Sequence, residues 1–141
     1  LSVPRPARVV VAIDGPAASG KSSTAHWVAE KLGYRHVDSG ALYRAVTALA
    51  LRDGGPADGW REGGLRALAE RVSLAPVDGG FEPRVDGASL GESIRGPEVT
   101  RHVSRVAQMP AIRAWVNERV REAGAHYDVV VDGRDIGTVV F

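Results

Sequence analysis

The chain has 141 residues, 44% hydrophobic and 25% charged, which is the composition of one globular domain and excludes disordered and collagen-like classes. Its formal net charge is only +1 and no apolar run could span a membrane, so we expect neither a nucleic-acid nor a membrane partner. Cysteine is absent, which excludes disulfides and thiol catalysis. Because residues 1–8 also lack the apolar segment of a signal peptide, we expect a cytoplasmic location.

The two ends of the sequence suggest a piece of a longer protein. The sequence begins at Leu1 instead of Met, and it stops in the apolar run Val139-Val140-Phe141, with no polar tail behind it. We therefore expect residues 1–141 to be a single, truncated domain.

Strands and helices alternate in the first predicted elements. The β-branched run 8–14 predicts a strand buried in a parallel sheet, and helical spacing of apolar residues predicts a helix over 21–32 that ends at Gly33. A second strand over 34–38 and a second helix over 39–52 follow. This alternation is typical of an α/β fold with a parallel core sheet.

The middle of the chain predicts a small antiparallel sheet. A helix over 65–72 precedes three strand-like segments separated by Asp-Gly turn sequences. These segments are 72–75, 81–85 and 88–90. Because no long polar linker surrounds them, we interpret the sheet as an insertion carried by the parallel core.

The last predicted elements are two helices and a strand. Proline in the first turn favours one helix from Pro97 to 108 and another from Pro110 to about 123. The run 129–132 then predicts a buried strand, followed by Gly133.

The segment between the first strand and the first helix matches the phosphate-loop pattern of Gly, four residues, Gly, Lys and Ser. Backbone N–H groups of such a loop surround phosphate oxygens, Lys21 would neutralise the β and γ oxygens, and the Ser22 hydroxyl would ligate Mg²⁺. The alternative, a loop that only turns the chain, is disfavoured by the strand-to-helix context. The predicted ATP-binding residues are Gly15, Pro16, Ala17, Ala18, Ser19, Gly20, Lys21, Ser22 and Ser23.

An acidic residue, Asp132, ends the last predicted strand. Beside a phosphate loop, such a carboxylate holds Mg²⁺ directly or through water, whereas by itself it is as often a residue that caps the next turn. The loop favours the magnesium role. We interpret Asp14 as support for the turn at Gly15, or for a water near the metal.

A second anion site is suggested by Ser39 and Arg44, one helical turn apart at the start of a predicted helix. Ser39 has an alternative role as the N-cap of that helix, and single surface arginines are usually only solvated. We interpret Trp27, Trp60 and Trp115 as packing residues instead of base-stacking platforms. The four histidines show no metal-ligand spacing and receive no site; they are His26, His36, His102 and His126.

Five ordered blocks of the sequence closely resemble bacterial cytidylate kinases, and together they are more specific than the phosphate loop alone. The blocks are 13–22 (IDGPAASGKS), 38–44 (DSGALYR), 94–99 (IRGPEV), 103–107 (VSRVA) and 132–141 (DGRDIGTVVF).

The resemblance implies the three-layer P-loop fold of the nucleoside monophosphate kinases, with 62–125 as the insertion that binds the acceptor. It implies a monomeric transferase of pyrimidine nucleotide metabolism, which uses Mg²⁺ to transfer the γ-phosphoryl group of ATP to CMP or dCMP. In that family further core elements and a mobile lid follow the block that ends at Phe141. We therefore expect a polypeptide ending there to be poorly folded and inactive, because the strand 129–132 would lack neighbours.

The resemblance also implies roles for individual residues. The acceptor phosphate would be held by Ser39, Arg44 and Arg134, and the cytosine by Ser104, Arg113 and Asp135. The catalytic residues would be Lys21, Arg44, Arg134 and Asp135. Arginine can donate to cytosine O2 and N3, and a carboxylate can accept from the exocyclic amine, whereas uracil would place a carbonyl against Asp135.

Two other functions stay open. One is a phosphate-loop kinase of another small metabolite, against which the insertion and the pair Arg113 and Asp135 argue. The other is a nucleotide-dependent binding module that holds ATP without transferring phosphate.

Overall fold

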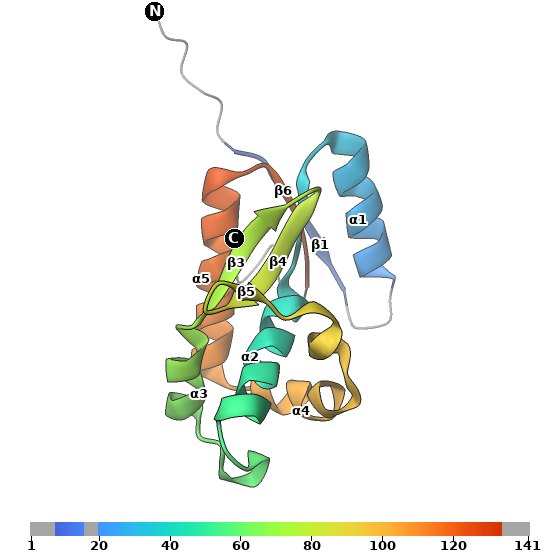
Figure 1. Cartoon of the computed structure of the whole chain (residues 1–141). Coiled ribbons are helices and arrows are strands. Elements are labelled where there is room, and N and C mark those ends of the chain that lie inside the picture. Colours follow the sequence, from blue (N-terminus) through green and yellow to red (C-terminus); the bar gives the residue numbers. More distant parts are fainter. Residues whose placement is uncertain (1–7, 16–19, 134–141) are drawn as a thin grey trace, which may run out of the picture.

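The computed structural model describes residues 8–15 and 20–133, and the strands found there form one mixed sheet (Figure 1). They are β1 (Val10–Asp14), β2 (Arg35–Asp38), β3 (Val72–Val77), β4 (Gly80–Val85), β5 (Ala88–Ser89) and β6 (Val129–Gly133). The strand order is β1-β6-β2-β4-β3, with β5 paired to β4. The β1-β6-β2 part is parallel, while β4 is antiparallel to β3 and β5.

Helices cover both faces of the parallel part of the sheet. The α-helices are α1 (Lys21–Leu32), α2 (Ser39–Asp53), α3 (Glu62–Ala69), α4 (Pro97–Ala107) and α5 (Pro110–His126), with 3-10 turns η1 (Ala57–Gly59) and η2 (Gly91–Arg95). On one face, α1 packs Ala25 and Ala29 against Val130 of β6. On the other face, Val129 and Val131 pack in the larger core with α2 and α5. The predicted α/β fold with a parallel core sheet is thus confirmed.

The alternation of side chains along β6 explains this layering. Successive strand residues point to opposite faces, so Val129 and Val131 enter the core under α2 and α5, and Val130 and Asp132 face α1. All four are buried, because parallel strands at the centre of a sheet are covered on both faces.

The expectation that the strand 129–132 would lack neighbours is wrong. β6 lies between β1 and β2 and pairs with both, from Val10↔Val129 on one side and from Arg35↔Val129 on the other. β6 can pair on both sides because the connection through α1 leaves one strand position open between β1 and β2, and β6 fills that position.

The antiparallel strands were predicted as a sheet of their own, but they continue the parallel sheet. β4 joins β2 through the single parallel pair His36↔Gly80, and the His36 N–H donates to the carbonyl of Gly79 at 3.0 Å. The Arg35 guanidinium strengthens this junction, since it donates to the carbonyls of Val77 and Gly80 and lies 5.0 Å from the ring centre of Tyr127.

Two predicted helices have different ends in the structure. The helix expected over 65–72 is α3, which begins at Glu62 and ends at Ala69. Burial of Leu65 and Ala69 stabilises this helix although its first turn contains Gly63 and Gly64, which have low helix propensity. The helix expected to end near 123 continues to His126, and the Tyr127 N–H donates to the carbonyl of Ala123 at 2.9 Å.

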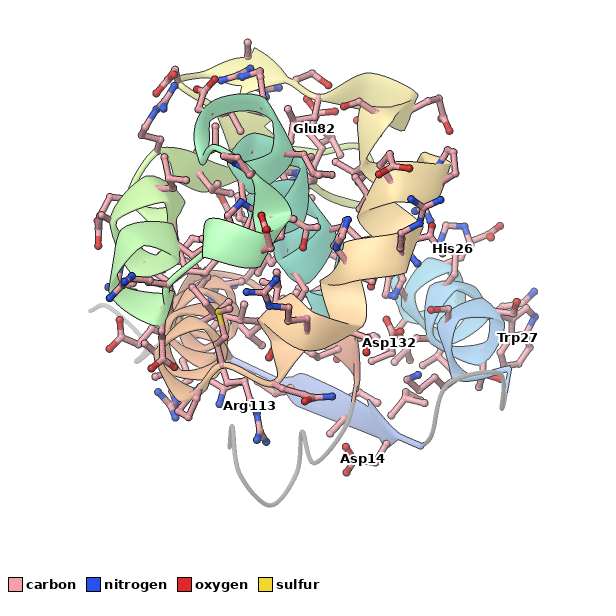
Figure 2. All side chains as sticks on the ribbon, turned by 90° about the horizontal axis from the view of Figure 1, so that it is seen from below. Asp14, His26, Trp27, Glu82, Arg113 and Asp132 are labelled. Carbon is pink, nitrogen blue, oxygen red and sulfur yellow. The ribbon has the colours of Figure 1, made fainter. Side chains whose placement is uncertain are left out.

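Of the three tryptophans predicted to pack, Trp60 and Trp115 are buried, but the prediction for Trp27 is wrong. Trp27 is 60% exposed on the outer side of α1, where the Lys31 ammonium lies 5.8 Å from its ring centre (Figure 2). The face of α1 that contacts the sheet is formed by Ala25 and Ala29, and Trp27 does not lie on that face. Within the described residues, no helix combines the length and the hydropathy needed to cross a membrane.

Candidate functional site

The start of α1 has the geometry that the phosphate-loop pattern predicts. Gly20 precedes the helix with φ of 79°, a left-handed conformation that favours glycine, and α1 begins at Lys21 beyond the carboxyl end of β1. The Gly15 N–H donates to the carbonyl of Gly133 at 3.4 Å, which ties the start of the loop to β6. Ser22 and Ser23 stand in the first turn of α1, while Pro16, Ala17, Ala18 and Ser19 lie outside the described residues.

The two predicted magnesium ligands are in contact. The Ser22 hydroxyl donates to Oδ2 of Asp132 at 2.8 Å, although the two residues are 110 positions apart. Asp132 is 2% exposed at the end of β6. A serine hydroxyl and a buried carboxylate are oxygen donors of the kind that Mg²⁺ prefers, so this pair fits the ion.

The second carboxylate oxygen of Asp132 contacts the imidazole of His36, a residue to which the sequence analysis gave no site. Nε2 of His36 lies within hydrogen-bond distance of Oδ1. Burial acts to raise the pKa of Asp132, but the hydrogen bonds from His36 and Ser22 and the charge of Lys21 outweigh it and hold that pKa below its usual value. Asp132 is therefore ionised at neutral pH.

Ser39 also contacts this cluster, but not as an N-cap. It is the first residue of α2, after the capping position held by Asp38, so the N-cap alternative is wrong. Its buried hydroxyl donates to the backbone carbonyl of Asp132 at 2.9 Å. This bond fixes the start of α2 against the end of β6.

A second group of predicted residues gathers around α2 and α5. Arg44 donates to the carbonyl of Ile94 at 3.4 Å and to the Thr100 hydroxyl at 3.3 Å. Burial raises the pKa of the preceding residue, Tyr43, although the nearby Arg113 acts in the opposite direction. Ser104 is exposed on α4.

Within the described chain, Ser22, Ser39 and Asp132 gather around the end of β6, whereas Arg44 contacts η2 and α4 and Arg113 lies near Tyr43. Arg134 and Asp135 lie outside the described residues.

A cavity of about 630 Å³ opens beside the first of these groups. Its walls come from α1, β2, β4 and η2, and they include Ser22, His26, His36 and Glu82. Figure 2 shows His26 on α1 and Asp132 beside that helix, with Glu82 in the upper half of the view and Arg113 in the lower half. The predicted cytosine ligand Arg113 is therefore away from the cavity wall formed by β4.

The described residues contain no cluster of three or more His, Asp or Glu that could hold a metal by itself.

Comparisons with known proteins identify the family of the chain. A sequence model described as "Cytidylate kinase" matches residues 11–141. A cytidylate kinase of Thermus thermophilus is 47% identical over 95% of this chain and 64% of its own length, and one of Chlorobaculum tepidum is 43% identical over 94% and 56%. A bifunctional pantoate ligase/cytidylate kinase of a Synechococcus strain is 42% identical over 96% of this chain and 26% of its own length. The chain therefore spans less than two thirds of the curated relatives it matches, and it belongs to the cytidylate kinase family.

Proposed function

We propose that the protein containing this chain is a cytidylate kinase, which transfers the γ-phosphoryl group of ATP to CMP or dCMP and so forms ADP and CDP or dCDP. The observation that carries the proposal is the Ser22–Asp132 hydrogen bond at the start of α1, because it couples a phosphate-loop hydroxyl to a buried carboxylate. Membership of the cytidylate kinase family supports the choice of acceptor.

ATP would bind at the start of α1. The backbone N–H groups of residues 15–23 would surround its phosphates at the positive end of the helix dipole, and Lys21 would neutralise the β and γ oxygens. Ser22 and Asp132 would hold Mg²⁺, which when bound neutralises charge on the transferring phosphoryl group.

CMP would bind beside α2, with further ligands on α4 and α5. Ser39, Arg44 and Arg134 would hold its phosphate, while Ser104, Arg113 and Asp135 would bind the cytosine. The proximity of Arg113 to Tyr43, the residue before Arg44, supports this assignment, because it brings a proposed base ligand near a proposed phosphate ligand. One nucleotide could then contact both.

The chain would act by alignment and charge neutralisation. The acceptor phosphate of CMP is already an anionic nucleophile, so no side chain is needed to remove a proton from it. Arg44 and Arg134 would hold this nucleophile in line with the γ-phosphate, and Lys21 would offset the charge between the two nucleotides.

We further propose a monomer in the cytoplasm, in which residues 62–125 form the acceptor-binding insertion. The lack of cysteine supports the location. Residues 62–125 include α3, the antiparallel strands, α4 and α5, and the last of these carries Arg113.

The test is release of ADP from ATP and magnesium by the full-length protein, with CMP, dCMP or UMP as acceptor. A cytidylate kinase releases ADP with CMP and dCMP and much less with UMP. A kinase of another metabolite would release no ADP with CMP, and a binding module would bind ATP without acceptor-dependent turnover. Asp132→Asn is the matched control: it removes the charge of the carboxylate at nearly constant volume, so ADP release should fall.

A further inference from the structure

The carboxylate of Asp132 is held at both oxygens by side chains from different elements. Oδ2 accepts from Ser22 of α1, and Oδ1 contacts Nε2 of His36 of β2. The side chains of His36 and Asp132 are 15% and 3% exposed. The Ser22 contact belongs to the phosphate-loop pattern, whereas no motif in the sequence pointed to His36.

We propose that His36 is a positioning residue, which orients the Asp132 carboxylate so that it and Ser22 are aligned for the magnesium ion. This inference rests on the kinase function proposed above. His36 acts on Asp132 and not on the reacting atoms, so it is not a catalytic residue.

The sheet explains why His36 is held so firmly. β2 and β6 are parallel neighbours in the register His36↔Val130 and Asp38↔Asp132, so residues 36 and 132 lie diagonally on the face that α1 covers. The backbone of His36 is fixed on its other side as well, because its N–H donates to the carbonyl of Gly79 at 3.0 Å. The imidazole therefore reaches Asp132 from a rigid strand.

The chemistry of the pair defines which group donates. An ionised carboxylate only accepts hydrogen bonds, so Nε2 of His36 carries a hydrogen and donates a hydrogen bond to Oδ1. With Oδ2 held by Ser22, this second donor prevents rotation of the carboxylate about its terminal bond. Without it, Asp132 would keep one partner and gain freedom to turn away from the metal position.

The ring of His36 also contacts α1. The ring of His26 contacts it edge-on, with 5.9 Å between the centroids, and both rings line the cavity beside Ser22. His26 is exposed, whereas His36 reaches inward to Asp132. His26 is therefore the natural control, since it is a histidine of the same cavity on the far side of the proposed positioning residue.

The experiment measures Mn²⁺ binding to the full-length protein with a non-hydrolysable ATP analogue, from the electron paramagnetic resonance signal of free Mn²⁺. Partners that orient metal ligands typically contribute about 10- to 100-fold to metal affinity, so His36→Phe, which keeps the ring and removes the donor, should weaken Mn²⁺ binding at least about tenfold. His36→Gln should restore most of it, because its amide nitrogen can reach the position of Nε2. His26→Phe should bind Mn²⁺ like the unchanged protein.

The outcomes separate this inference from the proposed function. Unchanged Mn²⁺ affinity in His36→Phe overturns the positioning role and leaves the kinase function intact. Absence of nucleotide-dependent Mn²⁺ binding in the unchanged protein overturns both. Weakened binding in His36→Phe and His36→Gln alike shows a packing role and also overturns the inference. If His36→Phe does not fold, His36→Leu is the second donor-free variant, compared with His36→Gln in the same way.

Discussion

The Ser22 hydroxyl donates a hydrogen bond to Oδ2 of Asp132, which joins the first turn of α1 to the middle strand of the parallel sheet. Because β1 and β2 pair with β6 on both sides, the backbone that carries Asp132 is held by two ladders of hydrogen bonds. The helix that would bind phosphate is thereby aligned with a carboxylate that could bind the accompanying metal. This relationship leads to the first prediction.

Removal of the Ser22 hydroxyl should impair use of ATP. We expect Ser22→Ala to lower kcat/KM for ATP at least about tenfold, since it deletes a proposed metal ligand and a partner of Asp132. Ser22→Thr is the matched control, because it keeps the hydroxyl at the same place. Steady-state ADP release over a range of ATP concentrations measures both; equal losses in the two variants would contradict the role of the hydroxyl.

The ends of α1 could be predicted from local signals alone. Gly20 and Gly33 flank the helix with φ of 79° and 70°, left-handed conformations in which glycine is favoured, and such residues mark helix boundaries in a sequence. The pairing of Ser22 with Asp132 was likewise predictable in outline, since a phosphate loop and a strand that ends in Asp are typical partners.

The role of His36 could not be predicted in this way, because it depends on strand order. Residues 36 and 132 become neighbours only when β6 lies beside β2, and single-sequence patterns do not specify which strands pair. The bond from Ser39 to the Asp132 carbonyl has the same origin. Residues that belong to a motif can therefore be predicted from the sequence, whereas a contact that depends on strand order cannot.

The proposed role of Arg113, which lies near Tyr43, predicts a specific effect on the acceptor. Arg113→Met should raise KM for CMP about tenfold or more, because it removes a proposed charged donor to the base. Tyr43→Phe keeps both the ring and the charge of Arg113, so a smaller rise in KM is expected. KM for ATP should be unchanged in both variants, and a parallel rise in the KM for ATP would argue against a cytosine-binding role.

Selectivity for cytosine provides a separate prediction. Asp135 lies outside the described residues, and its proposed role is to accept a hydrogen bond from the exocyclic amine of CMP. Asp135→Ala should therefore lower kcat/KM for CMP more than for UMP and bring the two closer together. An unchanged CMP to UMP ratio would show that Asp135 does not read the base.

The packing of α2 predicts which of its residues support the fold. Leu42 is 0% exposed in the main core, so Leu42→Ala should lower the free energy of unfolding by about 3 kcal/mol. Arg52, on the same helix, has a side chain that is 54% exposed, and Arg52→Ala should change that free energy by less than about 0.5 kcal/mol. Denaturant unfolding of the full-length variants measures both, and similar losses would place Leu42 outside the core.

The last prediction concerns acid stability and a cluster distant from the nucleotide sites. Arg71 donates to Asp86 through Nε at 3.1 Å and Nη2 at 2.7 Å, and to Asp53 through Nη1 at 3.0 Å. The hydrogen bonds from Arg71 hold the pKa of Asp86 below its usual value. A carboxyl with a lower pKa in the folded state adds stability above its unfolded pKa, and this contribution is lost as the pH falls through the folded pKa.

Arg71→Met should therefore lower Tm at about pH 7, and the difference from the unchanged protein should shrink as the pH falls from about 5 to 3. Asp86→Asn is the control for the turn, because Asp86 has φ of 51° and Asn tolerates that left-handed conformation. It removes the titrating group, so its Tm should fall less between the same two pH values than that of the unchanged protein. A Tm difference in Arg71→Met that stays constant over this range would mean that Arg71 stabilises the fold through packing and not through its bond to the Asp86 carboxylate.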